Sequence, residues 1–130
     1  MDREYFVKEN IWIYYTPDMD QTLRWFEQVL GWNGKIFDRD DQGRGTYGFV
    51  SDIPSELIIS GAVPFKGVHF WQGESIKQIM ALIQVSNVDA LYHFVTKNGW
   101  KQIGEIYKTG ASPKTCNVKT IDGSILSFFE

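Results

Sequence analysis

Residues 22–32 read TLRWFEQVLGW, and residues 90–100 read ALYHFVTKNGW. At an offset of 68 residues, the two stretches share Leu, Phe, Gly and Trp without a gap. In both, apolar residues recur at the spacing of an amphipathic helix, and a glycine, which favours a helix C-terminus, ends the pattern. Two unrelated amphipathic helices can match by coincidence, so the segments around them decide whether the match is a repeat.

The segments around the two helices follow the same order. Residues 10–16 (NIWIYYT) are predicted as a strand before the first helix, and residues 33–38, 44–51 and 56–60 as strands after it. Residues 79–86 are predicted as a strand before the second helix, which spans 88–97, and residues 100–108, 114–121 and 124–129 as strands after it. This order favours duplication of one βαβββ module. We therefore expect a single α+β domain over residues 1–130, with a module at 9–62, a connection at 63–76 and a module at 77–130.

Length and charge exclude several classes of protein. A chain of 130 residues suits one domain, and its net charge of -3 provides no basic face for nucleic acid. The N-terminal MDREYFVKEN has no apolar run typical of a signal peptide, and no segment approaches the ~20 apolar residues of a membrane span. The single cysteine, Cys116, cannot form an internal disulfide, which favours a reducing, cytoplasmic location.

Aromatic residues are unusually abundant, with five Trp, six Tyr and nine Phe. One interpretation is a core built of large side chains. The other is a cleft whose rings contact a planar or apolar ligand, because aromatic faces give large contact area at low entropy cost. Composition leaves both open.

Three motifs together resemble a known superfamily. They are Asp18 with residues 25–31 (WFEQVLG), Val88-Asp89 through Asn98-Gly99, and Asp122-Gly123 followed by residues 124–130. In order and spacing they are similar to the helices and closing strand of the vicinal oxygen chelate superfamily, which includes glyoxalase I and the bleomycin resistance proteins. The resemblance covers about residues 11–130 and implies an eight-stranded, cup-shaped sheet with helices outside, a ligand inside the cup, and a homodimer.

The resemblance also implies four metal-ligand positions, one on the first and one on the last strand of each module. In metal enzymes of the superfamily these positions hold His, Glu or Gln. Carried over by motif spacing, they fall on Ile11, Ile59, Met80 and Ser127. None is a good ligand for a divalent transition metal, and a single His69 does not replace them. We therefore expect no metal, no cofactor, and no metal-dependent glyoxalase or dioxygenase activity.

Strand alternation predicts which side chains face the cup, since successive side chains point to opposite faces. A slip of one residue would exchange the two faces. For each side chain the alternative is ordinary core packing, so the convergence of the set carries the prediction. The ligand-binding residues predicted by alternation are Ile13, Tyr15, Met80, Leu82, Gln84, Ser127 and Phe129. Further candidates by position are Tyr47, Phe49, His69 and Trp71.

The sequence contains none of the catalytic motifs that we looked for. A nucleophile elbow, a phosphate-binding glycine loop and a zinc-ligand spacing are all missing. The function expected is therefore metal-independent binding of an aromatic or apolar small molecule. The alternatives are a lyase or isomerase that uses other chemistry, and a ligand-sensing module that acts with a partner protein.

Overall fold

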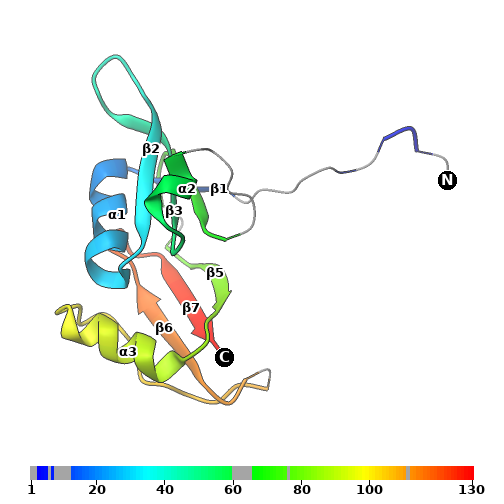
Figure 1. Cartoon of the computed structure of the whole chain (residues 1–130), viewed down its shortest axis with the longest axis vertical. Helices are drawn as coiled ribbons and strands as arrows, with labels where there is room; N and C mark the ends of the chain where they lie inside the picture. The colour runs from blue at the N-terminus through cyan, green and yellow to red at the C-terminus, as the bar shows by residue number, and fades with distance from the viewer. Residues whose placement is uncertain (1–2, 6, 8–12, 60–65, 76, 111) are drawn as a thin grey trace.

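The computed structural model describes residues 3–5, 7, 13–59, 66–75, 77–110 and 112–130, and it forms two sheets with helices packed against them (Figure 1). The first half contains β1 (Ile13–Thr16), α1 (Met19–Trp25), the π-helical η1 (Phe26–Leu30), β2 (Asn33–Arg39), β3 (Gly45–Ser51), α2 (Ser55–Ile59) and β4 (Val68–Gln72). The second half contains β5 (Ile79–Gln84), α3 (Val88–Lys97), β6 (Thr115–Lys119) and β7 (Ile125–Phe129). No helix in the described part is long and apolar enough to span a membrane.

In both sheets the first and last strands along the chain are paired in parallel. The first sheet has the order β1-β4-β3-β2, and β1 is parallel to β4. The second sheet has the order β5-β7-β6, and β5 is parallel to β7. The remaining strand pairs are antiparallel. The expected α+β fold of repeated modules is thereby confirmed.

The fourth strand of the first sheet is not where the sequence analysis put it. Residues 56–60 were expected to be a strand, but Ser55–Ile59 is α2, which begins directly after Pro54. A short apolar run does not distinguish a strand from a helix, and proline is favoured at a helix start. The fourth strand is β4, inside the segment expected to be the connection 63–76. Its side chains alternate in burial, because Val68 and Phe70 are buried whereas Trp71 is exposed.

The strand expected at residues 100–108 is reduced to two isolated bridges. Ile103 pairs with Val118, and Tyr107 pairs with Thr115. Gly104 lies between them and has no side chain to pack on a neighbouring strand. The described residues therefore form seven named strands rather than the expected eight.

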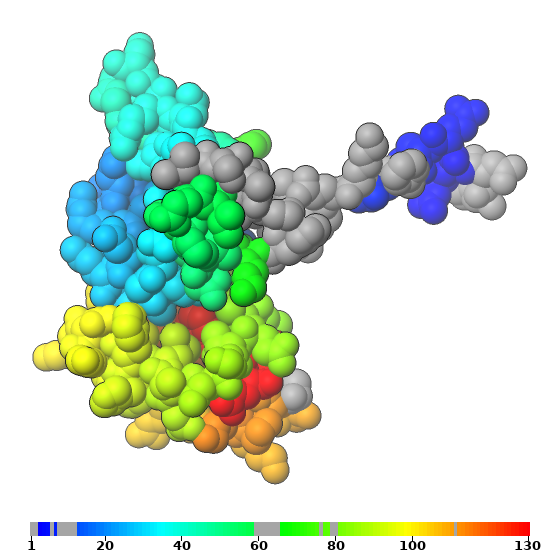
Figure 2. Space-filling model, in the orientation of Figure 1, coloured from blue at the N-terminus to red at the C-terminus, as the bar shows by residue number. Residues whose placement is uncertain are grey.

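One hydrophobic core joins the two halves of the chain. Phe26 of η1 and Phe70 of β4 belong to the same buried cluster as Val118 of β6 and Phe128 of β7. The Asn98 Nδ2 also donates to the carbonyl of Val29 at 3.2 Å. In Figure 2 the first half, in blue to green, lies directly against the second half, in yellow to red. The helix-covered face of each sheet therefore points toward the common core, and the other face points away from it.

The two modules differ by one residue in the distance along the chain from the helix cap to the glycine that follows the helix. Asp18 caps α1 by accepting from the Gln21 N–H at 3.0 Å, and Asn87 caps α3 by accepting from the Ala90 N–H at 2.9 Å. These caps are 69 residues apart, whereas the glycines Gly31 and Gly99 that follow the helices are 68 apart. A π-helical turn accommodates one additional residue, and η1 lies in the longer helix.

Candidate functional site

Six of the predicted residues, four from the first module and two from the expected connection, lie on one face of the first sheet. Ile13 pairs with His69 and Tyr15 with Trp71 across β1 and β4, while Tyr47 pairs with Trp71 and Phe49 with His69 across β3 and β4. Paired residues point to the same face of a sheet. Their neighbours Tyr14, Val50 and Phe70 point the other way, into the core. We call the first set, together with Phe37, the aromatic face: Ile13, Tyr15, Phe37, Tyr47, Phe49, His69 and Trp71.

Phe37 is a member of this face that the sequence analysis missed. Its ring lies 5.5 Å from that of Tyr47, at 31°. Lys35 pairs with Phe49, and alternation along β2 from Lys35 to Phe37 places Phe37 on the same face. The register shift beside Phe37 leaves Asp38, rather than Phe37, paired with Tyr47.

His69 lies at the centre of the ring contacts on this face. Its ring is stacked on Tyr47 at 5.9 Å and 9°, and it contacts the Phe49 ring at 4.6 Å. Tyr15 and Trp71 meet edge to face at 6.5 Å on the same sheet. Phe49 is buried beneath the others, whereas Trp71 is 47% exposed and Tyr15 and Phe37 are exposed to a similar extent. The face therefore offers three accessible rings around a buried platform.

A hydrogen bond fixes the orientation of the central pair. The Tyr47 Oη and the His69 Nδ1 are 2.8 Å apart, and the imidazole tautomer decides which one donates. A phenol bonded to an imidazole holds a proton that is transferable between them, so this pair is also the one arrangement on the face that suits acid–base chemistry.

Four predicted residues of the second module share a face of the second sheet. Leu82 pairs with Ser127, and Gln84 pairs with Phe129. Leu82 is highly exposed and Ser127 is buried, while the Gln84 Nε2 donates to the Glu130 carbonyl at 3.0 Å. Met80 lies where the β5–β7 register shifts, and its side chain is outside the part of the structure that is described.

The structure corrects one of the four positions at which metal enzymes hold ligands. Ile59 was expected at the second position, but it lies in α2, whereas the last strand of the first sheet is β4. Ile13 precedes the cap Asp18 by the same number of residues as Leu82 precedes the cap Asn87. Since Ile13 pairs with His69 as Leu82 pairs with Ser127, His69 is the counterpart of Ser127.

This set of side chains does not fit a divalent metal. His69 supplies one imidazole and Ser127 one neutral hydroxyl, Ile11 lies outside the described residues, and among the described residues no group of three His, Cys, Asp or Glu could hold a metal.

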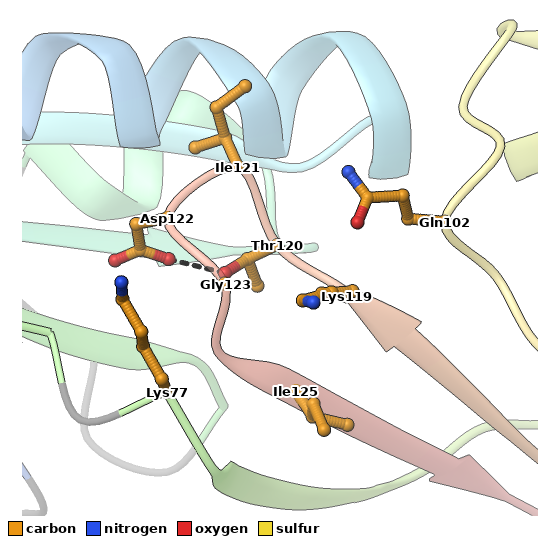
Figure 3. Close-up of a pocket in the computed structure, with 8 residues that line it drawn as sticks. All are labelled: Lys77, Gln102, Lys119, Thr120, Ile121, Asp122, Gly123 and Ile125. Carbon is orange, nitrogen blue, oxygen red and sulfur yellow. Dashed lines mark hydrogen bonds between the residues drawn. The ribbon is translucent and has the colours of Figure 1, made fainter.

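Two cavities lie elsewhere, near the turn between β6 and β7. One, of about 420 Å³, includes Lys77, Gln102 and Lys119 in its lining (Figure 3). The other, of about 550 Å³, includes Gln21 and Glu74. Both contact Lys77 and Asp122, and the Asp122 carboxylate accepts from the Thr120 hydroxyl, as the dashed line in Figure 3 shows. Neither is lined by a predicted ligand-binding residue.

Cys116 is not a candidate nucleophile. It is fully buried in β6, and its Sγ donates to the carbonyl of Gly104 at 3.3 Å. Burial raises the pKa of the thiol from 9.0 to about 11. Because only the thiolate is reactive, the group is inert near neutral pH.

Comparison with known proteins identifies relatives in sequence and in fold. The family described as bleomycin resistance protein domain matches residues 12–73, which contain the whole first sheet. A comparison with curated proteins finds no match. A glyoxalase-related enzyme from Clostridium phytofermentans is 46% identical, with a TM-score of 0.90, over 99% of this chain and 98% of its own.

More distant structures share the fold alone. A bleomycin-binding protein from Streptomyces verticillus, solved with copper(II)-bleomycin, is 12% identical, with a TM-score of 0.66 over 96% of this chain and 97% of its own. The bleomycin resistance determinant of the transposon Tn5 is 12% identical, with a TM-score of 0.67 over 95% and 98%. Together with the 46% identical relative and the repeated βαβββ topology, these matches show that the chain belongs to the glyoxalase and bleomycin resistance family of the vicinal oxygen chelate superfamily.

Proposed function

We propose that this protein binds an aromatic or apolar small molecule on the aromatic face, without a metal. The observation that carries the proposal is the group of accessible rings of Tyr15, Phe37 and Trp71 around the buried Phe49. Exposed apolar area of this kind is unfavourable in water, and each Å² covered by a ligand is worth roughly 25 cal/mol. A flat ring system covers it best, because it stacks on the face or meets the rings edge on.

The relatives support small-molecule binding by this fold. The similar structures include a bleomycin-binding protein solved with bleomycin and an antibiotic-binding protein from Streptomyces. The family match at residues 12–73 includes every residue of the aromatic face. Metal independence is supported by the chemistry of His69 and Ser127, which provide too few donors.

We further propose a homodimer in the cytoplasm. The aromatic face is open on one side, and a second copy would cover it and enclose the ligand. The lone buried thiol of Cys116 suits a reducing compartment. Light scattering after size exclusion should give twice the 15.0 kDa of one chain, and a monomer with unchanged ligand affinity would remove the dimer from the proposal.

Ligand titration tests the site directly. We expect 2-naphthol to bind in isothermal titration, with Trp71→Ala and Tyr15→Ala each weakening Kd by about tenfold through lost contact area. Phe94→Ala is the matched control, because Phe94 is a similarly exposed ring on α3. The same titration in EDTA should give the same Kd. Unchanged binding in Trp71→Ala and Tyr15→Ala would place the ligand elsewhere.

A second function is favoured by the bond between Tyr47 and His69, namely proton transfer at a carbon next to a carbonyl. The similar Clostridium phytofermentans protein is described as a glyoxalase-related enzyme. NMR in D₂O would follow deuterium entering 2-tetralone, which has an aromatic ring and acidic α-protons. Catalysed exchange that His69→Gln abolishes while 2-naphthol binding persists would support an enzyme. If deuterium exchange with the protein is no faster than in buffer, ligand binding remains as the only proposed function.

A further inference from the structure

A group of polar side chains lies on the face of the second sheet that carries Leu82 and Ser127. Asn117 of β6 pairs with Ser127 of β7, and Thr115 pairs with Phe129. Their neighbours Cys116 and Val118 are fully buried on the other face. Thr115, Asn117 and Ser127 therefore share the face on which the second module's predicted ligand-binding residues lie. Ser127 is among the residues predicted from the sequence, whereas Thr115 and Asn117 of β6 are not.

Two polar atoms of this group are buried without a hydrogen-bond partner in the described structure. They are the Thr115 Oγ1 and the Asn117 Oδ1. Thr115 as a whole is only 5% exposed, so water does not readily take the place of a partner. Buried polar side-chain atoms are nearly always bonded in native proteins, and an unpaired one lowers stability. Two of them on neighbouring rows of one sheet face indicate a requirement other than folding.

The amide of Asn117 is oriented by Tyr107. The Asn117 Nδ2 donates to the Tyr107 Oη at 3.1 Å, which leaves the Oδ1 as an acceptor. The bridge between Tyr107 and Thr115 places the tyrosine on the same face, so its ring reaches from the row of Thr115 to that of Asn117. Tyr107 is itself about 44% exposed. The unpaired acceptor therefore lies next to an accessible ring.

We propose that Thr115 and Asn117 form a polar subsite that binds an N–H or O–H group of the ligand. The inference rests on the proposed function, and it requires one molecule to reach both the aromatic face and this group on the second sheet. An Asn117 Oδ1 acceptor favours a donor and disfavours a carboxylate, while the Thr115 hydroxyl both donates and accepts. The ligand class is thus an aromatic compound that carries a hydroxyl, amide or amine group.

Isosteric apolar substitutions separate a ligand-binding role from a structural one. Thr115→Val keeps approximate size and removes only the unpaired hydroxyl, whereas Asn117→Leu removes both the unpaired Oδ1 and the hydrogen bond from Nδ2 to Tyr107. We expect Thr115→Val to raise the melting temperature of the ligand-free protein, and both variants to weaken the binding of 2-naphthol, by roughly tenfold for a lost hydrogen bond. Thr22→Val is the matched control, because Thr22 is equally buried but its hydroxyl is bonded to Thr16 Oγ1 at 2.6 Å. It should lower the melting temperature and leave Kd unchanged.

Three probes of similar shape give the chemical selectivity. We expect wild-type protein to bind 2-naphthol, which carries a donor, about tenfold more tightly than 2-methoxynaphthalene, and 2-naphthoate most weakly. In Thr115→Val and Asn117→Leu the difference between naphthol and methoxynaphthalene should disappear.

The two proposals fail in different ways. If all three probes bind wild type alike and both variants leave that pattern unchanged, the polar subsite is wrong while the aromatic face stands. If Thr115→Val lowers the melting temperature as Thr22→Val does, the Thr115 hydroxyl is structural and the subsite is also wrong. If none of the probes binds, both proposals are overturned together.

Discussion

The indole rings of Trp25 and Trp100 meet edge to face, with centroids 5.4 Å apart and planes at 74°. Trp25 ends α1 and is buried, and Trp100 follows α3, where its Nε1 donates to the Lys119 carbonyl at 2.8 Å. The pair therefore connects the helix of the first half to the second sheet. It is one of several contacts between the two halves, together with the shared core and the bond from Asn98 to Val29.

A double-mutant cycle measures what this ring contact contributes. We expect Trp25→Leu and Trp100→Leu to be coupled by about 0.5–1.5 kcal/mol in urea unfolding, because an edge-to-face pair is worth that much beyond its buried area. Trp100→Leu combined with Phe49→Leu, on the far face of the first sheet, should be additive. Additivity in the Trp25–Trp100 cycle as well would mean that the rings only fill space.

The additional residue in the first helix makes a sharper test of the repeat. Deleting Gln28, an exposed residue of η1, shortens the distance from Asp18 to Gly31 to that from Asn87 to Gly99. We expect the deletion to convert the π turn to α-helix and to leave a cooperative unfolding transition, since it removes the residue that the π turn accommodates.

Deleting His93 from α3 is the control for that experiment. His93 is also exposed, but its helix has no additional residue, so everything after it would rotate by about 100° relative to the core. We expect loss of cooperative unfolding and of native circular dichroism. If the Gln28 deletion is equally damaging, the π turn is required by its surroundings and is not an accommodated insertion.

Gly67 controls how the aromatic platform packs. It has φ +135°, and a Cβ there would lie 2.2 Å from the Val50 carbonyl oxygen and 2.6 Å from the Phe49 ring. We expect Gly67→Ala to cost about 2–4 kcal/mol of unfolding free energy, because backbone strain and a clash act together. Displacement of Phe49 should also weaken 2-naphthol binding.

Gly43→Ala separates the two contributions at Gly67. Gly43 has φ +80°, but a Cβ there would meet nothing within 4 Å. We expect a cost of about 1 kcal/mol from backbone conformation alone, and unchanged 2-naphthol binding. Equal losses in the two variants would show that the contact with Val50 and Phe49 is relieved at little cost.

The sequence predicted those features that depend on local pattern. The caps and glycines located both main helices, and the predicted residues Ile13 and His69 are paired on one face of the first sheet. Features that depend on tertiary context were missed. Residues 55–59 have the composition of a strand or a helix, and only packing decides between them.

The gapless alignment of the two helices also matched one pair of residues that are not structurally equivalent. Phe26 and Phe94 coincide at the offset of 68, yet Phe26 is fully buried and Phe94 is largely exposed. From the caps, which are 69 apart, the residue that corresponds to Phe26 is Val95, which is equally buried. The π turn changes the offset partway along the helix, and a gapless match does not detect it.

The buried thiol gives a dependence of stability on pH. The pKa of Cys116 is about 11 when folded, against 9.0 for the free group, so the folded state retains a proton that the unfolded state loses. Its contribution is fully present below pH 9 and declines as pH rises from about 9 toward 11. Relative to Cys116→Ala, wild type should therefore lose unfolding free energy over that range in urea titrations. Between pH 6 and 8 the difference between the two proteins should stay constant. A constant difference up to pH 11 would instead mean that the thiol ionises in the folded state as it does in the unfolded chain.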